Sequence, residues 1–254
     1  MTRAQVAGTI AGVTPEQTAT LIRPAVQELG GAFEECPKTL RRARQLGLTG
    51  WSFYVAGRGG ALGDVGLDTV TAALGFIPID AVRDGWDTAR RVTTPSQVAE
   101  QHLAECCRWG RERLDHLPGV HRLVELTERV VYAADPAGLA LFGAWRAMPV
   151  PEDGPGARAA VLAKLLLEHR IGAHLVAVRA GGLSPLEALV AGHRGEAAAL
   201  AYGWQPPFPP VGPLLRRRIR ADVVTDRIVG EALAVLDVTE RVELARLLAE
   251  AVKG

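Results

Sequence analysis

A four-residue helix-start motif occurs at three places and constrains the fold more than any other feature of this sequence. Residues 14–17 read TPEQ, residues 94–97 read TPSQ and residues 184–187 read SPLE. In each motif a hydroxyl side chain can cap the first turn, proline suits the first helical position, and Gln or Glu can complete a capping box. These side chains satisfy backbone N–H groups that have no partner inside the helix. The motifs predict a chain built from helices.

The rest of the sequence agrees with an all-α fold. Aromatic residues make up only 5% of the chain, and no stretch alternates convincingly between apolar and polar residues. The one ambiguous run, WSFYVA at residues 51–56, suits either a short strand or a buried helical turn. We expect helices at about 15–30, 37–46, 67–75, 95–117, 119–134, 137–146, 156–180, 185–192, 194–202, 213–236 and 239–252.

Segments rich in glycine and proline divide the chain. Residues 57–66 are glycine-rich, residues 149–156 (PVPEDGPG) resemble a linker, and residues 206–213 (PPFPPVGP) contain five prolines. Proline removes a backbone donor and clashes with the preceding turn, so the last segment cannot be a helix interior. We expect two helical lobes, 1–150 and 151–254. The second is expected to have a helix-turn-helix-like core and a degenerate winged-helix-like C-terminal part.

Charge and cysteine content restrict the function classes. The net charge of +1 provides no overall field that would attract nucleic acid or a membrane surface. The three cysteines suggest neither a disulfide framework nor a zinc site. No apolar run is long enough for a membrane span. We therefore expect a cytoplasmic protein without cofactor or metal, and we do not expect nucleic acid or a membrane as its partner.

The predicted helix at 156–180 carries polar groups within a run that is apolar on nearly every side, which indicates a buried helix. Arg170 and His174 are four residues apart and share one face. Burying an unpaired charge is costly, so Arg170 requires either a wet cavity or an acidic partner. Two interpretations stay open: a structural hydrogen-bond network, or one wall of a ligand site. Glu168 and His169 are expected on neighbouring, more exposed faces.

A second group of candidates precedes the glycine-rich segment. Tyr54 and Arg58 are also four apart and would share a helix face, with Trp51 nearby. The glycines favour a structural turn over a phosphate cradle, because no known phosphate-binding motif is present. Trp145 could cap a cavity. The candidate catalytic residues are His174, Arg170 and Tyr54, and the candidate substrate-binding residues are Arg58, Trp51, Trp145 and His169.

Four segments together resemble a known family: FYVAGRGGALG (53–63), ADPAGLALFGAWRAMPVPED (134–153), LLLEHRIGAHLVAVRAGGLSPLEALV (165–190) and AYGW (201–204). They resemble an actinobacterial group of helical proteins that are usually described as helix-turn-helix or MarR-like, over about residues 15 to 250. The resemblance implies a helix-turn-helix scaffold.

Two departures from the family pattern affect what it implies. The family has HRGDGH where this chain reads HRIGAH, so an acidic residue is missing. Family members also follow their Gly-Trp pair with a polar helix and a wing-like turn. Here Gly203 and Trp204 lead into QPPFPPVGP, which no base-reading helix can occupy.

These observations leave functions of different classes. Our main expectation is a small-molecule-binding helical protein acting as a cofactor-independent cyclase, lyase or isomerase of specialised metabolism. Histidine would transfer protons and arginine would hold an anionic group of a biosynthetic intermediate in an interhelical pocket. The alternative is a MarR-like DNA-binding transcriptional regulator, which the arginines at 216–218 and 220 favour. A third interpretation is a ligand-binding or structural protein without catalytic activity. The two terminal helices also suggest a homodimer.

Overall fold

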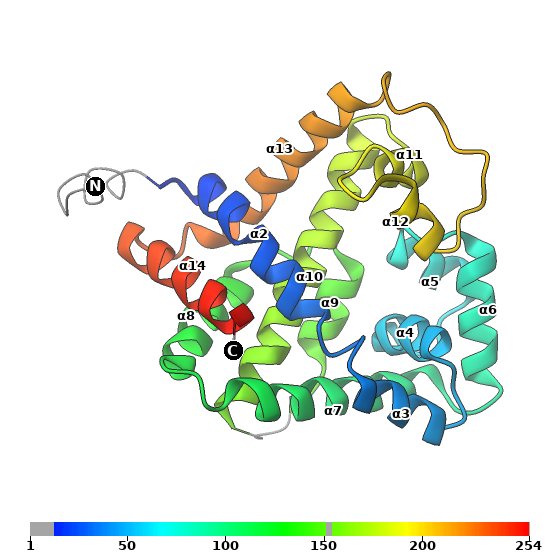
Figure 1. Ribbon diagram of the computed structural model, residues 1–254, viewed down its shortest axis with the longest axis horizontal. Coiled ribbons are helices and arrows are strands. Elements are labelled where there is room, and N and C mark those ends of the chain that lie inside the picture. The colour runs from blue at the N-terminus through cyan, green and yellow to red at the C-terminus, as the bar shows by residue number, and fades with distance from the viewer. Residues whose placement is uncertain (1–12, 151–153, 254) are drawn as a thin grey trace.

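A computed structural model describes residues 13–150 and 154–253, and every regular element in these residues is a helix (Figure 1). The all-α expectation is confirmed. The elements are α2 (Pro15–Gly31), α3 (Pro37–Gln45), α4 (Gly50–Gly59), the 3₁₀ helix η1 (Gly60–Leu62), α5 (Leu67–Leu74), α6 (Ile79–Arg90), α7 (Pro95–Leu114), α8 (Val120–Ala133), α9 (Ala140–Ala147), α10 (Pro155–Ala180), α11 (Pro185–Val190), α12 (Gly195–Ala201), α13 (Leu215–Leu233) and α14 (Val238–Lys253).

The helix-start motifs act as the sequence predicts. Complete capping boxes begin α2 at Thr14, α7 at Thr94 and α11 at Ser184. At α11 the backbone N–H of Glu187 donates to Ser184 Oγ at 3.1 Å, and the Glu187 carboxylate accepts from the backbone N–H of Ser184. A fourth box, which we did not predict, begins α4 at Thr49. The caps therefore fix where these helices start.

Helix α10 runs through the middle of the molecule, and α2, α7, α8 and α13 pack around it (Figure 1). Its N-terminal half is buried on almost every side, as a helix without a polar face must be. The largest core cluster joins residues from both sides of position 150, for example Phe33 and Leu126 with Leu162. The division into lobes 1–150 and 151–254 stays a prediction.

A second cluster holds α4, α5 and α6 together and corrects the interpretation of the glycine-rich segment. Residues 51–56 are helical, the second of the two expected alternatives, and Gly57 and Gly59 belong to α4 instead of forming a turn, while Gly60 begins η1. A Cβ on Gly57 would lie 2.4 Å from His102 Cδ2, and a Cβ on Gly60 would lie 2.0 Å from the Pro95 carbonyl oxygen. The glycines therefore allow α7 to approach α4 and η1 closely. Helix α6 was also not predicted.

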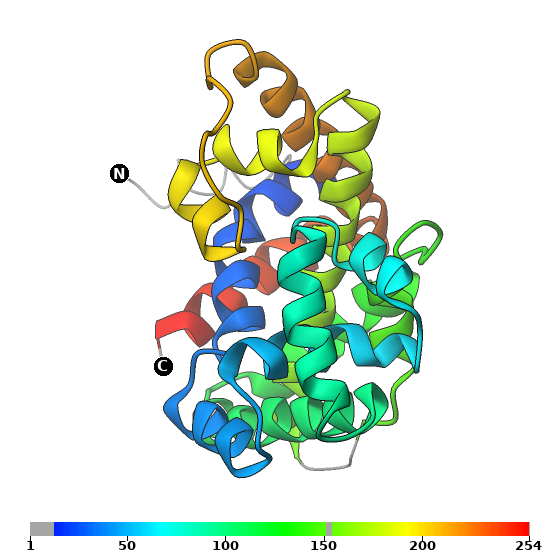
Figure 2. The ribbon, with the colours of Figure 1, turned by 90° about the vertical axis from the view of Figure 1, so that its right-hand side faces the viewer.

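A third cluster joins the C-terminal end of α10 to α11 and the start of α13. Leu183, fully buried in the turn between α10 and α11, and Val178 on α10 lie at its centre. In Figure 2 this end of the molecule is at the top, whereas α3 and α7 lie at the bottom. In the described chain, helix α10, a short turn, α11, a second turn and α12 follow one another as a helix-turn-helix arrangement.

The segment between α12 and α13 forms no helix, in agreement with its proline content. Its first residues are fixed to the α5–α6 region instead. Trp204 Nε1 donates to the Phe76 carbonyl oxygen at 2.8 Å, Tyr202 packs against the second core cluster, and Gly203 lies directly against Ala81. Across the described ranges, no helix is both long and apolar enough to span a bilayer.

Candidate functional site

Arg170 has the acidic partner that its burial requires. The residue is only 7% exposed, and its Nη2 lies 2.7 Å from Asp226 Oδ1 on α13. Nη1 donates to the Ala19 carbonyl oxygen on α2 at 3.3 Å. Thr20 Oγ1 donates to the second carboxylate oxygen of Asp226 at 2.7 Å. The guanidinium therefore links α2, α10 and α13.

His174 shares the face of Arg170, as its spacing predicts, and both ring nitrogens have protein partners. Nδ1 lies 2.9 Å from Thr225 Oγ1, and Nε2 faces the Arg218 guanidinium, which donates to it. The ring stacks on Phe76 with centroids 5.6 Å apart. Burial first, and then the nearby positive charge of Arg218, lower the pKa of His174 to about 3. The imidazole is held neutral between α10, α13 and Phe76.

Tyr54 and Arg58 share a face, as predicted, and belong to a buried charge network. Arg58 Nη1 donates to Tyr54 Oη at 2.7 Å. Arg58 also donates two hydrogen bonds to the Glu168 carboxylate, from Nε to Oε1 at 2.8 Å and from Nη2 to Oε2 at 2.9 Å. Lys164 Nζ lies 3.1 Å from the same carboxylate and 2.5 Å from Glu34 Oε1. The expected exposure of Glu168 is wrong, since the residue is 1% exposed.

The network fixes the protonation of its members. Burial alone would raise the pKa of Glu168, but the charges of Arg58 and Lys164 lower it to about 2. Burial raises the pKa of the Tyr54 hydroxyl well above its ordinary value, so the phenol stays protonated. His102, which packs against this cluster, has its pKa lowered well below the ordinary value by burial first and then by Lys164 and Arg58. The two cations, Arg58 and Lys164, are balanced by the carboxylates of Glu34 and Glu168.

The remaining candidates pack around these groups. Trp51 stacks on Tyr54 with centroids 5.6 Å apart, and its Nε1 donates to the Ala81 carbonyl oxygen at 2.9 Å. Trp145 is buried, and its Nε1 donates to the Arg58 carbonyl oxygen at 3.1 Å. His169 is also buried, contrary to expectation, and burial lowers its pKa to about 4.

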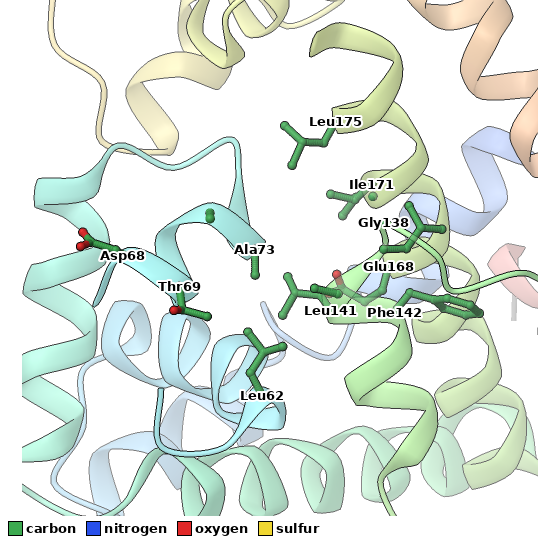
Figure 3. A pocket seen from close by; sticks show the side chains of 14 residues that line it. Leu62, Asp68, Thr69, Ala73, Gly138, Leu141, Phe142, Glu168, Ile171 and Leu175 are labelled. Carbon is green, nitrogen blue, oxygen red and sulfur yellow. The ribbon is translucent and has the colours of Figure 1, made fainter. Parts of the chain in front are cut away.

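A cavity of about 510 Å³ lies between α5, α9 and α10 (Figure 3). Its walls are mostly apolar, and α10 contributes Glu168, Ile171, Gly172 and Leu175. Arg170 and His174 face α13, so they do not line it, and neither do the other five candidate residues. The one buried carboxylate at its wall, Glu168, already forms ion pairs with Arg58 and Lys164. Within the described ranges no cluster of three or more metal-binding side chains occurs.

Cationic groups gather at the opposite end from α3. His193 and Arg194 are exposed in the turn between α11 and α12, and Arg216, Arg217 and Arg220 are exposed at the start of α13. The two segments adjoin, because a Cβ on Gly192 would lie 3.7 Å from Arg218 Nη2. Arg194 was not among our candidates; it was expected as the first residue of the helix at 194–202, and in the structure it lies in the turn just before α12.

One comparison with known proteins gives a match. The model of a helix-turn-helix family matches residues 19–208, about three quarters of the chain, while no curated protein and no solved structure matches. The match overturns our main expectation of a small-molecule-binding enzyme. The closed contacts of Arg170 and His174 agree with this correction, because the pocket function required both groups to face an open cavity. The structure's α10–α12 arrangement and this match lead to one assignment: the chain belongs to the helix-turn-helix family.

Proposed function

We propose that this protein binds duplex DNA through the end of the molecule that carries α11 and α12. The observation behind the proposal is the helix-turn-helix family match, which extends from α2 through α12. Helix-turn-helix units place a short helix against a supporting one and present the pair to the duplex. The narrower prediction of a MarR-like transcriptional regulator additionally requires action at a promoter, and it stays a prediction.

The packing of α11 supports a rigid docking unit. Leu183, Ala188 and Ala191 are buried in one cluster with Val178 of α10. The capping box at Ser184 fixes the start of α11, so α10 and α11 keep a defined relative orientation. The turn that follows is exposed and carries Arg194. A cation on a fixed turn is suited to a phosphate contact.

The test is a mobility-shift titration of the full chain with fragments of bacterial genomic DNA at low salt. We expect shifted complexes, and we expect Arg194→Glu to weaken them by about tenfold, because a carboxylate would then face the phosphates. Arg113→Glu is the matched control, since Arg113 is exposed at the end of α7, beside α3. Failure of the native chain to shift any fragment would refute the proposal.

The homodimer also stays a prediction, although several of the apolar residues that suggested it are not available for an interface. Leu233, Leu236, Leu244, Leu247 and Leu248 of the terminal helices are buried in the protein's own core. The exposed apolar residues Leu215, Ile219 and Val223 form a row on α13 instead, at four-residue spacing. Light scattering of the native chain and of Ile219→Glu would measure whether this row joins two copies.

A further inference from the structure

The exposed start of α13 lies outside the family match, which ends at residue 208. Arg216, Arg217 and Arg220 are exposed there. Arg216 and Arg220 form no ion pair with any residue that the structure describes, while Arg217 Nη1 donates to the Gly182 carbonyl oxygen at 3.1 Å. Neighbouring Arg218 differs, because it is partly buried and bonded to Asp222 and His174. Three guanidiniums are therefore presented to solvent.

The overall charge conceals this local surplus. Residues 179–220 contain six arginines and two glutamates, a net charge of +4, which leaves −3 for the rest of the +1 chain. Of the two glutamates, Glu187 is held in the capping box of α11, and Glu196 is on α12. A surplus of this kind at one end creates a local potential that attracts an anionic partner.

Helix stability does not explain why these arginines stand where they do. The first turn of a helix carries a partial positive charge, so cations there are unfavourable. Helix α13 has no acidic residue in its first turn, where most helices gain from one. The turn that carries Arg194 also adjoins the start of α13, because Gly192 lies against Arg218. A bound polyanion would compensate the repulsion among them.

Helix α12 exposes no side chain that reads base edges, and the first residues after it contain one, Gln205, whose Nε2 donates to the Gly203 carbonyl oxygen at 3.4 Å. The residues that α12 exposes are Glu196, Ala197, Leu200 and Ala201. Direct readout of guanine or adenine depends on arginine, lysine, asparagine or glutamine, which can bond two base atoms at once. The following residues are fixed away from this surface, because Trp204 is bonded to Phe76 and Gly203 packs on Ala81.

We propose that the start of α13, with Arg194, binds the phosphate backbone of duplex DNA with little dependence on sequence. This inference rests on the proposed DNA-binding function, and it assigns the contact to residues beyond the family segment. Arginine contacts to phosphates position a protein on the duplex without reading its bases. Three or four such contacts predict an affinity that falls steeply with salt concentration.

The experiment is fluorescence anisotropy of the full chain with labelled duplexes of about 20 base pairs, one rich in A·T and one rich in G·C, over a salt series. We expect dissociation constants within about threefold of each other, and a slope of log K against log salt near −3. Arg216→Ala/Arg217→Ala/Arg220→Ala should weaken binding by more than about tenfold and reduce the slope by about 2 to 3.

Two further variants separate a phosphate contact from other effects. Replacing the same three arginines by lysine should keep most of the affinity, because the charge remains. Arg41→Ala/Arg44→Ala/Arg113→Ala removes three exposed arginines from α3 and α7, at the other end, and should change neither affinity nor slope. Circular dichroism of each variant checks that the helices are intact.

Each outcome has a distinct meaning. A duplex selected from a random pool that binds more than about a hundredfold tighter than the others would overturn sequence tolerance and leave the DNA-binding function standing. Unchanged binding by the triple alanine variant would overturn the α13 assignment alone. No binding to any duplex, with or without binding to phosphatidylserine vesicles, would overturn both.

Discussion

Arg170 Nη2 and Asp226 Oδ1 lie 2.7 Å apart in a buried ion pair that joins α10 to α13. We predict that Arg170→Ala lowers the free energy of unfolding by about 3 to 5 kcal/mol, because it leaves the Asp226 carboxylate buried without its cation. Arg170→Met combined with Asp226→Leu should regain most of this loss, since both charges are then removed. Urea denaturation of the native chain and the variants measures these differences.

The control is an exposed pair on α14. Arg246 and Glu250 lie 2.7 Å apart and are both about half exposed, so Arg246→Ala should cost less than about 1 kcal/mol. Equal losses in the Arg170 and Arg246 variants would contradict the structural role assigned to Arg170.

The buried His169 and the partly buried His174 predict that the fold loses stability in mild acid. The pKa of His174 is about 3 and that of His169 about 4, against an ordinary value of 6.5. Because these values are depressed, the unfolded chain binds more protons between pH 4 and 6.5. The stabilising contribution is complete above 6.5 and is lost as the pH falls toward these values, with a slope of up to about 1.4 kcal/mol per pH unit for each histidine.

Urea denaturation over this pH range measures the slope. His169→Gln and His174→Gln should each make the dependence of stability on pH shallower, because glutamine does not titrate. Both variants should be less stable than the native chain near neutral pH. A slope identical to that of the native chain in both variants would mean that other groups cause the acid sensitivity.

A third prediction concerns the buried network around Glu168. Glu168→Gln leaves Arg58 and Lys164 with Glu34 as their only carboxylate partner, so we expect a loss of about 3 to 5 kcal/mol in the free energy of unfolding. The carboxylate stabilises the native chain above its unfolded pKa of 4.5, and this contribution disappears as the pH falls toward 2. In the variant, the free energy of unfolding should no longer fall between pH 4.5 and 2 for this reason. If it falls as steeply as in the native chain, another carboxylate causes the loss.

The capping motifs made most of the fold predictable. Hydroxyl, proline and Gln or Glu at fixed spacing specify a helix start locally, and α2, α7 and α11 begin where the sequence indicates. Helix α4 was missed because glycine disfavours helices in general. Here Gly57 and Gly60 are required by contacts with His102 and Pro95. Those partners lie some 35 to 45 residues away in the sequence, so local rules could not reveal them.

The site was less predictable, for two physical reasons. Burial of Arg170 indicated an acidic partner or a cavity. The sequence does not distinguish the two, because the partner, Asp226, lies on another helix 56 residues further along the chain. The net charge of +1 argued against nucleic acid as a partner, yet a total charge averages over the whole surface. Once the C-terminal end of α10, α11, α12 and the start of α13 are folded together, the six arginines of residues 179–220 belong to one end.

The anchoring of the segment after α12 gives the last prediction. Gly203 has φ of +93°, and a Cβ there would lie 2.7 Å from Ala81 Cβ. Gly203→Ala should therefore strain the backbone by about 1 to 3 kcal/mol and loosen the contact between Trp204 and Phe76. We expect faster amide hydrogen exchange in α12 and in residues 202–214, with little change in α7 and α8.

Gly212 provides the matched control in the same segment, because a Cβ there meets nothing within 4 Å. Gly212→Ala should leave the exchange rates of α12 unchanged, and Trp204→Phe, which removes the bond to Phe76, should reproduce part of the Gly203→Ala effect. If Gly203→Ala and Gly212→Ala gave the same exchange profile, the Gly203–Ala81 contact would not hold α12 in place. The surface that α12 presents would then have to be explained by its packing on α11 alone.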